Sequence, residues 1–281
     1  MKGFEKLPRD SYRKINRRKP KCLFLVLCWL LLPIWSALGQ ETLEAQSIRF
    51  RLIPGGAYLL GSPEEEPGRY ADEALPHRVS LRPFYISVTE ITNAQYGRFL
   101  KATGYQAPLY WQDQNLNGPN QPVVGVTWHD AVAFCRWLTN ITGVTHKLPT
   151  EDQWEAAARG GLVGQPYPWG AEAPDAGGVY RANFRTPLPG AAGFRFTAPV
   201  GAFAPNGYGL FDLAGNVSEW CQDRYVPLRT GGPFKPGILR LLKGGSWLSG
   251  PRELRLAARQ SAPPQYADGY IGFRVVRLPL P

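Results

Sequence analysis

Residues 206–220 of this chain read Asn-Gly-Tyr-Gly-Leu-Phe-Asp-Leu-Ala-Gly-Asn-Val-Ser-Glu-Trp. Three glycines and two asparagines break up any helical or alternating period, and these residue types favour turns. Two carboxylates, Asp212 and Glu219, stand seven residues apart on either side of a Gly-Asn turn. Pro, Gly, Asn and Trp also dominate the residues from Gly161 up to this stretch. A loop this long inside a compact domain is normally functional or held by ligands such as metal ions.

Three helices are expected before the loop region, each starting at a threonine or asparagine that favours the N-cap position. The expected spans are 92–100, 127–141 and 150–161. In the second and third, Asp130 and Gln153 stand three residues after the capping threonine, which is the spacing of a capping box.

Strands are expected where polar and apolar residues alternate. Such stretches are 47–60, with a turn at 54–56, then 78–88, 253–259 and 271–275. A few helices, short strands and one long loop region together predict a single loop-rich α+β domain, because no linker or repeat divides the chain.

The first 39 residues have the order of a secretory signal. A basic leader precedes an apolar run at 23–35, and the small residues Ala37 and Gly39 follow it. We therefore predict a signal peptide at 1–39 and a domain at 48–278, exported to the periplasm or secreted. A retained signal anchor is the alternative, and only then would the protein contact a membrane.

Charge and cysteine number exclude several classes of protein. The chain carries a net charge of +10, but nine of its 32 basic and two of its 22 acidic residues lie in the leader. The remainder is near +3, which does not favour nucleic-acid binding. Only Cys135 and Cys221 follow the leader, too few for a disulfide scaffold. Two possibilities remain for this pair: a Cys135–Cys221 disulfide, or two buried free thiols.

Familiar catalytic motifs are missing from the sequence. The three histidines are scattered without an HExxH pattern, residues 244–248 lack the second glycine of a nucleophile elbow, and no phosphate-binding P-loop occurs. Calcium prefers six to eight hard oxygen ligands, and a turn flanked by Asp212 and Glu219 offers carboxylates and carbonyls together. The alternative from composition alone is an ordinary turn with two solvated acids.

Nine short motifs occur in a fixed order along the chain. They are 54–62 (PGGAYLLGS), 90–96 (EITNAQY), 124–131 (VGVTWHDA), 148–155 (LPTEDQWE), 167–170 (YPWG), 206–210 (NGYGL), 215–220 (GNVSEW), 243–247 (KGGSW) and 272–274 (GFR). In this order they resemble the formylglycine-generating enzyme family, also called the sulfatase-modifying factor family, over roughly residues 50 to 277. The resemblance implies a low-secondary-structure α+β fold related to C-type lectins.

The resemblance also implies two calcium sites. One falls on the side chains of Asp212 and Glu219 and the carbonyls of Gly215 and Val217.

The second would use Asn183 and the carbonyls of Phe184 and Phe194, but Ala192 stands where the family has an aspartate. Calcium is therefore the expected cofactor at the first site, and the second lacks one carboxylate ligand.

The family's oxidases bind copper(I) through two cysteines shortly after the Gly-Gly-Ser motif, and soft thiolates suit that ion. Here the first of these positions aligns with Ser249, and the second has no counterpart in the shorter segment before Leu254. The chain resembles a divergent member that lacks the copper-binding pair, and bound copper is not expected.

The family's substrate surface places the candidate site near the Gly-Gly-Ser motif. Ser246, Ser249 and Glu253 are the candidate catalytic residues, although the catalytic group is unknown. Ser246 and Glu253 also fit structural roles, as a turn residue and as an ion-pair partner.

Substrate-binding candidates are Trp247, which offers a flat stacking face, and Arg255 and Arg259, which offer bidentate donors for a carboxylate or sulfate. The two arginines equally fit buried structural pairs with acids such as Glu219 or Glu253.

Two functional classes follow. As an oxidoreductase or maturase, the protein would modify an exported peptide or peptide-derived small molecule without copper, as branches resembling a pyoverdine maturation factor do. As a binding module, it would hold a ligand or client protein in a lectin-like pocket. Copper-dependent formylglycine formation is the third and weakest reading. The substrate, the oligomeric state and the organism do not follow from the residues.

Overall fold

A computed structural model describes residues 42–186, 188, 190–227 and 238–279. Contacts divide the chain into units of residues 1–38 and 39–281, and all described residues belong to the second. The predicted signal segment at 1–39 lies outside the described residues. Among the described residues, no helix is long and apolar enough to cross a membrane.

The three helices form where the capping patterns predict them. They are α1 (Asn93–Thr103), α2 (Trp128–Thr142) and α3 (Glu151–Arg159). Each has a complete capping box, in which the threonine hydroxyl accepts from the third backbone N–H and that residue's side chain accepts from the threonine N–H. Each ends at a left-handed glycine, as the sequence of α3 led us to expect.

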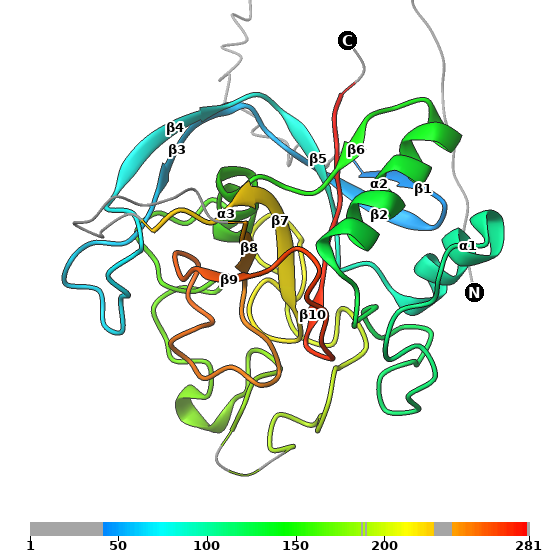
Figure 1. Cartoon of the computed structure of the whole chain (residues 1–281). Coiled ribbons are helices and arrows are strands. Elements are labelled where there is room, and N and C mark those ends of the chain that lie inside the picture. The colour runs from blue at the N-terminus through cyan, green and yellow to red at the C-terminus, as the bar shows by residue number, and fades with distance from the viewer. Residues whose placement is uncertain (1–41, 187, 189, 228–237, 280–281) are drawn as a thin grey trace, which may run out of the picture. The chain divides into compact units, whose positions relative to one another are not determined.

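The strands form three sheets (Figure 1). The first has the order β1 (Thr42–Ala45), β2 (Ile48–Ile53), β5 (Phe84–Ser87), β11 (Val276–Arg277) and β6 (His146–Lys147). The second has the order β10 (Ile271–Gly272), β7 (Ser218–Arg224), β8 (Arg240–Lys243) and β9 (Gln260–Ala262). The third pairs β3 (Gly56–Leu60) with β4 (His77–Leu81). Only the β10–β7 pair is parallel among these.

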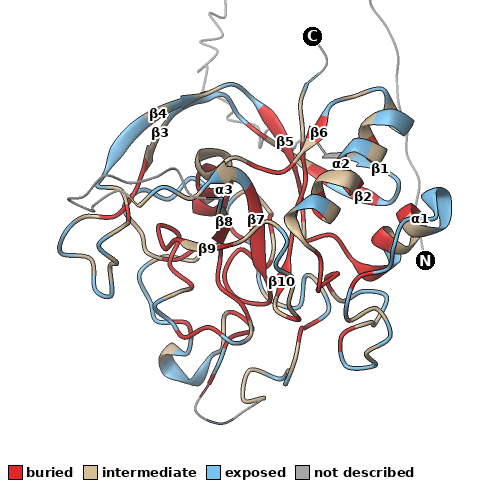
Figure 2. Ribbon diagram, viewed as in Figure 1, coloured by how far each residue is buried: buried red, intermediate tan, exposed pale blue. Residues whose placement is uncertain are grey.

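Between α3 and β7, the described residues contain one short 3-10 helix, Ala176–Gly178, and otherwise turns and loops. The prediction of a loop-rich α+β fold is therefore confirmed. Figure 2 shows that burial is concentrated on β5, β7, β8 and the facing side of α3. The long loop region packs against this core and is ordered by it.

The strand predicted at 253–259 is wrong, because these residues form consecutive turns. Leu254, Leu256 and Ala258 are buried as the alternation implied, but Arg255 and Arg259 between them are buried as well. Alternating polarity indicates a half-exposed strand only when the polar residues face solvent. Here the arginines point into ion pairs instead.

The strand predicted at 271–275 is also wrong in its extent. Ile271 pairs with Ser218 in the second sheet, whereas Val276 pairs with Ile86 in the first. The chain passes from one sheet to the other between β10 and β11, so one continuous strand cannot form. Arg274 lies in this crossing segment and is fully buried.

Arg274 holds the two sheets and the loop region together. It donates Nε to Glu219 Oε2 at 2.6 Å and Nη2 to Glu219 Oε1 at 2.7 Å. Its Nη1 donates to the Ser87 carbonyl at 3.1 Å, and its Nη2 also donates to the Phe211 carbonyl at 3.0 Å. Trp154 of α3 adds an indole N–H to Glu219 Oε2 at 2.7 Å. The bidentate pair therefore joins β7 and β5 to the turn before Asp212.

We predict that Arg274→Met destabilises the protein by about 3–5 kcal/mol, because it leaves the buried Glu219 carboxylate without its counter-charge. The exposed Arg78 on β4 supplies the matched control, and Arg78→Ala should change the unfolding free energy by less than about 0.5 kcal/mol. Urea unfolding of both variants checks this. Equal, small losses in the two would contradict the assignment of Arg274.

Candidate functional site

The turn at 212–216 is built from left-handed residues. Asp212, Gly215 and Asn216 have φ values of 56°, 78° and 59°. At Gly215 a glycine is required, since a Cβ there would lie 2.2 Å from the carbonyl oxygen of Asn183. This close approach brings the two loops predicted to hold calcium side by side.

Asn216 ties these loops to the Gly-Gly-Ser segment. Its side-chain oxygen accepts from the Asn183 amide at 3.2 Å and from the Ala198 N–H at 2.8 Å. Its side-chain amide donates to Glu90 Oε2 at 3.2 Å. Its main-chain oxygen accepts from the N–H of Trp247 at 3.0 Å. One buried amide thus contacts four separate segments of the chain.

Each predicted calcium loop holds a buried oxygen that lacks a partner in the described part of the chain. These oxygens are Asp212 Oδ1 and Asn183 Oδ1, and Glu90 Oε1 beside them is a third. Burial raises the pKa of Asp212 to about 6, and burial with the charges of Asp212 and Glu219 raises the pKa of Glu90 well above its usual value. The region therefore carries more carboxylates than the single charge of Arg274 neutralises.

The donor set fits calcium in part. Asp212 presents a free oxygen, but the oxygens of Glu219 already accept from Arg274 and Trp154, so an ion would share Glu219 with Arg274. In the second loop the side chain of Asn183 presents a free oxygen, whereas the side chain of Ala192 has no oxygen. No group of three or more His, Cys, Asp or Glu side chains among the described residues is arranged around a metal position. Most ligands would therefore be carbonyl and amide oxygens, which calcium accepts.

The Gly-Gly-Ser segment forms a tight buried loop. Ser249 Oγ accepts from the N–H of Ser246 at 3.0 Å, and the two hydroxyl oxygens lie 3.4 Å apart. Ser246 Oγ also accepts from the N–H of Leu248 at 3.2 Å. Trp247 is half-buried and donates its indole N–H to the Gly269 carbonyl at 3.1 Å. Both hydroxyls therefore have structural partners, as the turn alternative for Ser246 proposed.

Glu253 lies beside this loop. Its Oε2 is 3.3 Å from where a Cβ on Gly250 would stand, and its Oε1 accepts from the Tyr70 hydroxyl at 2.7 Å. Arg252 stacks its guanidinium over the Tyr70 ring at 3.6 Å. The structure thus places one carboxylate oxygen of Glu253 beside Gly250, the residue that follows Ser249.

Arg255 and Arg259 lie in buried ion pairs. Arg255 binds Glu66 Oε1 at 2.7 Å and both oxygens of Glu73. Arg259 binds Glu151 Oε1 at 2.7 Å. The partners are thus not Glu219 or Glu253. These contacts support the structural alternative for both arginines.

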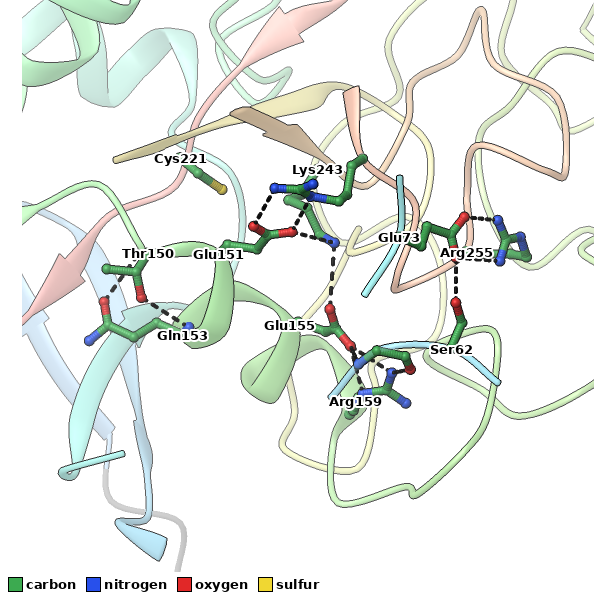
Figure 3. Close-up of polar contacts among 12 residues, drawn as sticks. Ser62, Glu73, Thr150, Glu151, Gln153, Glu155, Arg159, Cys221, Lys243 and Arg255 are labelled. Atoms are coloured by element: carbon green, nitrogen blue, oxygen red, sulfur yellow. Dashed lines mark hydrogen bonds and ion pairs between the residues drawn. The ribbon is translucent and has the colours of Figure 1, made fainter. Parts of the chain in front are cut away.

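The same region contains a second ionic cluster, shown in Figure 3. Glu155 binds Arg159 at 2.6 Å and lies 3.6 Å from the ammonium of Lys243, which precedes the Gly-Gly-Ser loop. Burial alone would raise the pKa of Glu155, but Lys243 and Arg159 lower it overall. Long-range pairs of this kind cannot be read from the sequence, and they fix the base of the loop.

The sequence analysis did not predict a groove of about 710 Å³ that residues 265–267 help to line. Tyr105, Leu109 and Tyr266 line it, with Asp130 and Gln265 among its polar groups. Trp247 does not line the groove, but hydrogen bonds connect the two: Tyr266 donates to Asp268, and Trp247 donates to the carbonyl of the next residue, Gly269. The tyrosines at 105, 110, 266 and 270 were the available signal.

Residues 39–279 match the family model described as the sulfatase-modifying factor enzyme 1-like domain. The chain belongs to this family. The family predicted from the motif order is confirmed, and so is the loop-rich α+β fold that it implied.

Three relatives show how the family varies. The formylglycine-generating enzyme of Streptomyces coelicolor is 38% identical, over 79% of this chain and 87% of the relative. The inactive C-alpha-formylglycine-generating enzyme 2 of Mus musculus is 31% identical, over 89% of this chain and 91% of the relative. The structure of PvdO from Pseudomonas aeruginosa superposes with a TM-score of 0.74 at 30% identity, over 85% of this chain and 98% of PvdO. This family member is therefore similar both to named enzymes and to a protein named inactive.

Both cysteines after the leader are free and buried. Cys135 belongs to the core around α2, and Cys221 to the core around α3 and β8. Burial raises the pKa of both thiols. Since the thiolate is the metal-binding form, neither residue has the environment of a metal ligand or a nucleophile.

Proposed function

We propose that this family member is an exported maturation factor that binds a peptide, or a peptide-derived small molecule, beside Trp247 and modifies it without protein-bound copper. The observation that carries the proposal is the groove lined by Tyr105 and Tyr266, whose 265–267 wall is linked to Trp247 through the hydrogen bond from the Trp247 indole to Gly269. Aromatic walls with a few polar groups suit an extended peptide, because they bury side chains and still offer hydrogen bonds to its backbone.

The site residues support a chemistry other than the copper route. Copper(I) needs two soft thiolates, and the loop offers the hydroxyls of Ser246 and Ser249, which are hard and weak donors. These hydroxyls therefore do not fit a copper(I) site. Glu253 is the candidate general acid or base for a bound substrate, because one of its carboxylate oxygens lies beside Gly250.

A specific observation favours the second candidate, a binding module without catalysis. Among the described residues, no carboxylate or imidazole hydrogen-bonds to Ser246 or Ser249, so neither hydroxyl has a base to activate it. In that case Trp247 and the groove would hold a client protein or ligand and leave it unchanged.

A comparison of exported peptides and metabolites with and without the gene tests the first proposal. We expect one product mass to disappear with the gene, and the variant Trp247→Ala to restore less than a tenth of it, because the stacking face is lost. Trp137 on α2 is also half-buried, and its ring centroid lies 5.4 Å from that of Phe134, so Trp137→Ala is the control and should restore the product.

Two other results would reject this proposal. An unchanged set of masses, with a client captured intact by the purified protein, would support the binding module. Conversion of a sulfatase peptide's cysteine to the aldehyde, with one copper ion bound per protein, would show a formylglycine-generating oxidase.

We also propose that calcium binds the 212–219 turn through Asp212 and neighbouring carbonyls, Gly215 and Val217 among them, with Glu219 shared with Arg274. The free buried oxygen of Asp212 and the excess of carboxylates around Arg274 support this. An ion there would order the turn that positions Trp247. It would also bind the native state selectively, and hence stabilise it by mass action.

Calcium at tenfold over its dissociation constant should raise the melting temperature, because it adds about 1.4 kcal/mol of stability by that linkage. Chelator should reverse the rise. Asp212→Asn should abolish the response, whereas Asp113→Asn, in an exposed turn, should keep it. A melting curve indifferent to chelator, with no calcium found by elemental analysis, would reject the site.

A further inference from the structure

A second pocket, of about 580 Å³, lies between two loops that the proposed function does not use. Pro63, Glu65, Glu66 and Pro67 line one side, and Pro166 and Tyr167 line the other. Arg255 contributes to the wall where the two loops meet. Arg255, a substrate-binding candidate from the sequence, therefore lines this pocket and not the loop around Trp247.

The charge of the pocket wall is negative. The Arg255 guanidinium is shared by two carboxylates, Glu66 at 2.7 Å and Glu73 at 3.0 Å. Burial alone would raise the pKa of Glu73, but hydrogen bonds from Arg255, Ser62 and Tyr70 lower it, which keeps the carboxylate ionised. A third carboxylate, Glu65, lies at the rim.

Glu66 and Glu65 both have oxygens left to offer. The Glu66 side chain is only 7% exposed, and in the described part of the chain it is hydrogen-bonded through Oε1 alone. Glu65 is exposed and has no ion-pair partner among the described residues. The second oxygen of Glu66 is not among the buried side-chain atoms without a partner, so it is open to solvent and can accept from a ligand.

Two nearby arginines do not line the pocket and so do not neutralise the carboxylates of its wall. Arg69 and Arg252 direct their guanidinium groups to main-chain carbonyls, and neither lines the pocket. The wall itself therefore presents two carboxylates, Glu65 and Glu66, against one guanidinium whose charge Glu73 also shares. The net charge of the wall therefore favours a cationic ligand over an anionic one, although the buried Nε of Arg255 has no acceptor among the described residues.

The rest of the wall is apolar and rigid. Three prolines and two alanines line it together with Tyr167. The Tyr167 ring is itself fixed, because Trp169 stacks on it with an interplanar angle of 6°. Such a surface suits the methylene stem of a long side chain, whose charged end can then reach a carboxylate.

We propose that this pocket binds a lysine or arginine side chain of a peptide, with the stem against the prolines and Tyr167 and the cationic end at Glu65 and Glu66. A free polyamine shares the cationic chemistry, but it lacks the flanking backbone that a pocket with an open rim would contact. The proposal does not depend on the proposed function, because it concerns binding at a separate set of residues.

The test is an NMR titration of the full folded domain, observing the backbone amides of residues 64–66, Gly164, Gln165 and Tyr167. The probe is Nα-acetyl-lysine methylamide, with Nα-acetyl-norleucine methylamide as the uncharged analogue and spermidine as the polyamine. We expect the lysine probe to shift these amides and the norleucine probe to bind at least threefold more weakly.

Glu65→Gln and Glu66→Gln should each weaken the lysine probe about three- to tenfold, and raised salt should weaken it further. Glu44 is an exposed residue of β1 outside the pocket, so Glu44→Gln is the matched control and should leave binding unchanged. Glu65 is exposed, so its variant keeps the fold even where Glu66→Gln disturbs it.

Three outcomes would overturn the proposal. They are no shift of these amides by the lysine probe, equal binding of the norleucine probe, and tighter binding of spermidine than of the lysine probe. None of these outcomes bears on whether an exported product disappears with the gene, so the two proposals fail separately.

Discussion

The structure depends on one buried amide held in a left-handed backbone conformation. Asn216 has a φ of 59° and is 1% exposed, so every polar atom of its side chain must find a partner inside the protein. It finds them on Asn183, Ala198 and Glu90, and its main chain binds Trp247. Asparagine suits this position because it tolerates the left-handed conformation and carries both a donor and an acceptor. The loop region, which lacks regular backbone ladders, is ordered through these bonds.

Electrostatics sets the second constraint. Glu90, Asp212 and Glu219 are buried near a single guanidinium, that of Arg274. A buried carboxylate without counter-charge either takes up a proton or attracts a cation. The proposed calcium ion and protons would therefore compete for the same excess negative charge, and the 212–216 turn would respond to whichever is bound. Through the bond from Trp247 to Asn216, that turn is connected to the proposed substrate site.

The sequence predicted most where the causes are local. Thr127 with Asp130 and Thr150 with Gln153 define helix starts within one turn, and the structure has both capping boxes. The prediction at 253–259 was wrong because the partners of Arg255 and Arg259 are more than a hundred residues away, on Glu73 and Glu151. The groove at Tyr105 and Tyr266 was missed for the same reason, since two distant loops form it. Motif order identified the family, but it did not predict the hydrogen bonds that hold Ser249 in its loop, which the structure shows.

Native-state hydrogen exchange tests the role of Asn216 most directly. The N–H of Ala198 donates to the Asn216 side chain, whereas the N–H of Trp247 donates to its main-chain oxygen. The variant Asn216→Gly keeps that oxygen and allows the left-handed conformation, but removes the side chain. If Asn216 makes these loops one cooperative unit, the amides of Ala198 and Trp247 exchange with one opening free energy in the wild type and both lose protection in the variant. Loss of protection at Ala198 with full protection retained at Trp247 would contradict the account.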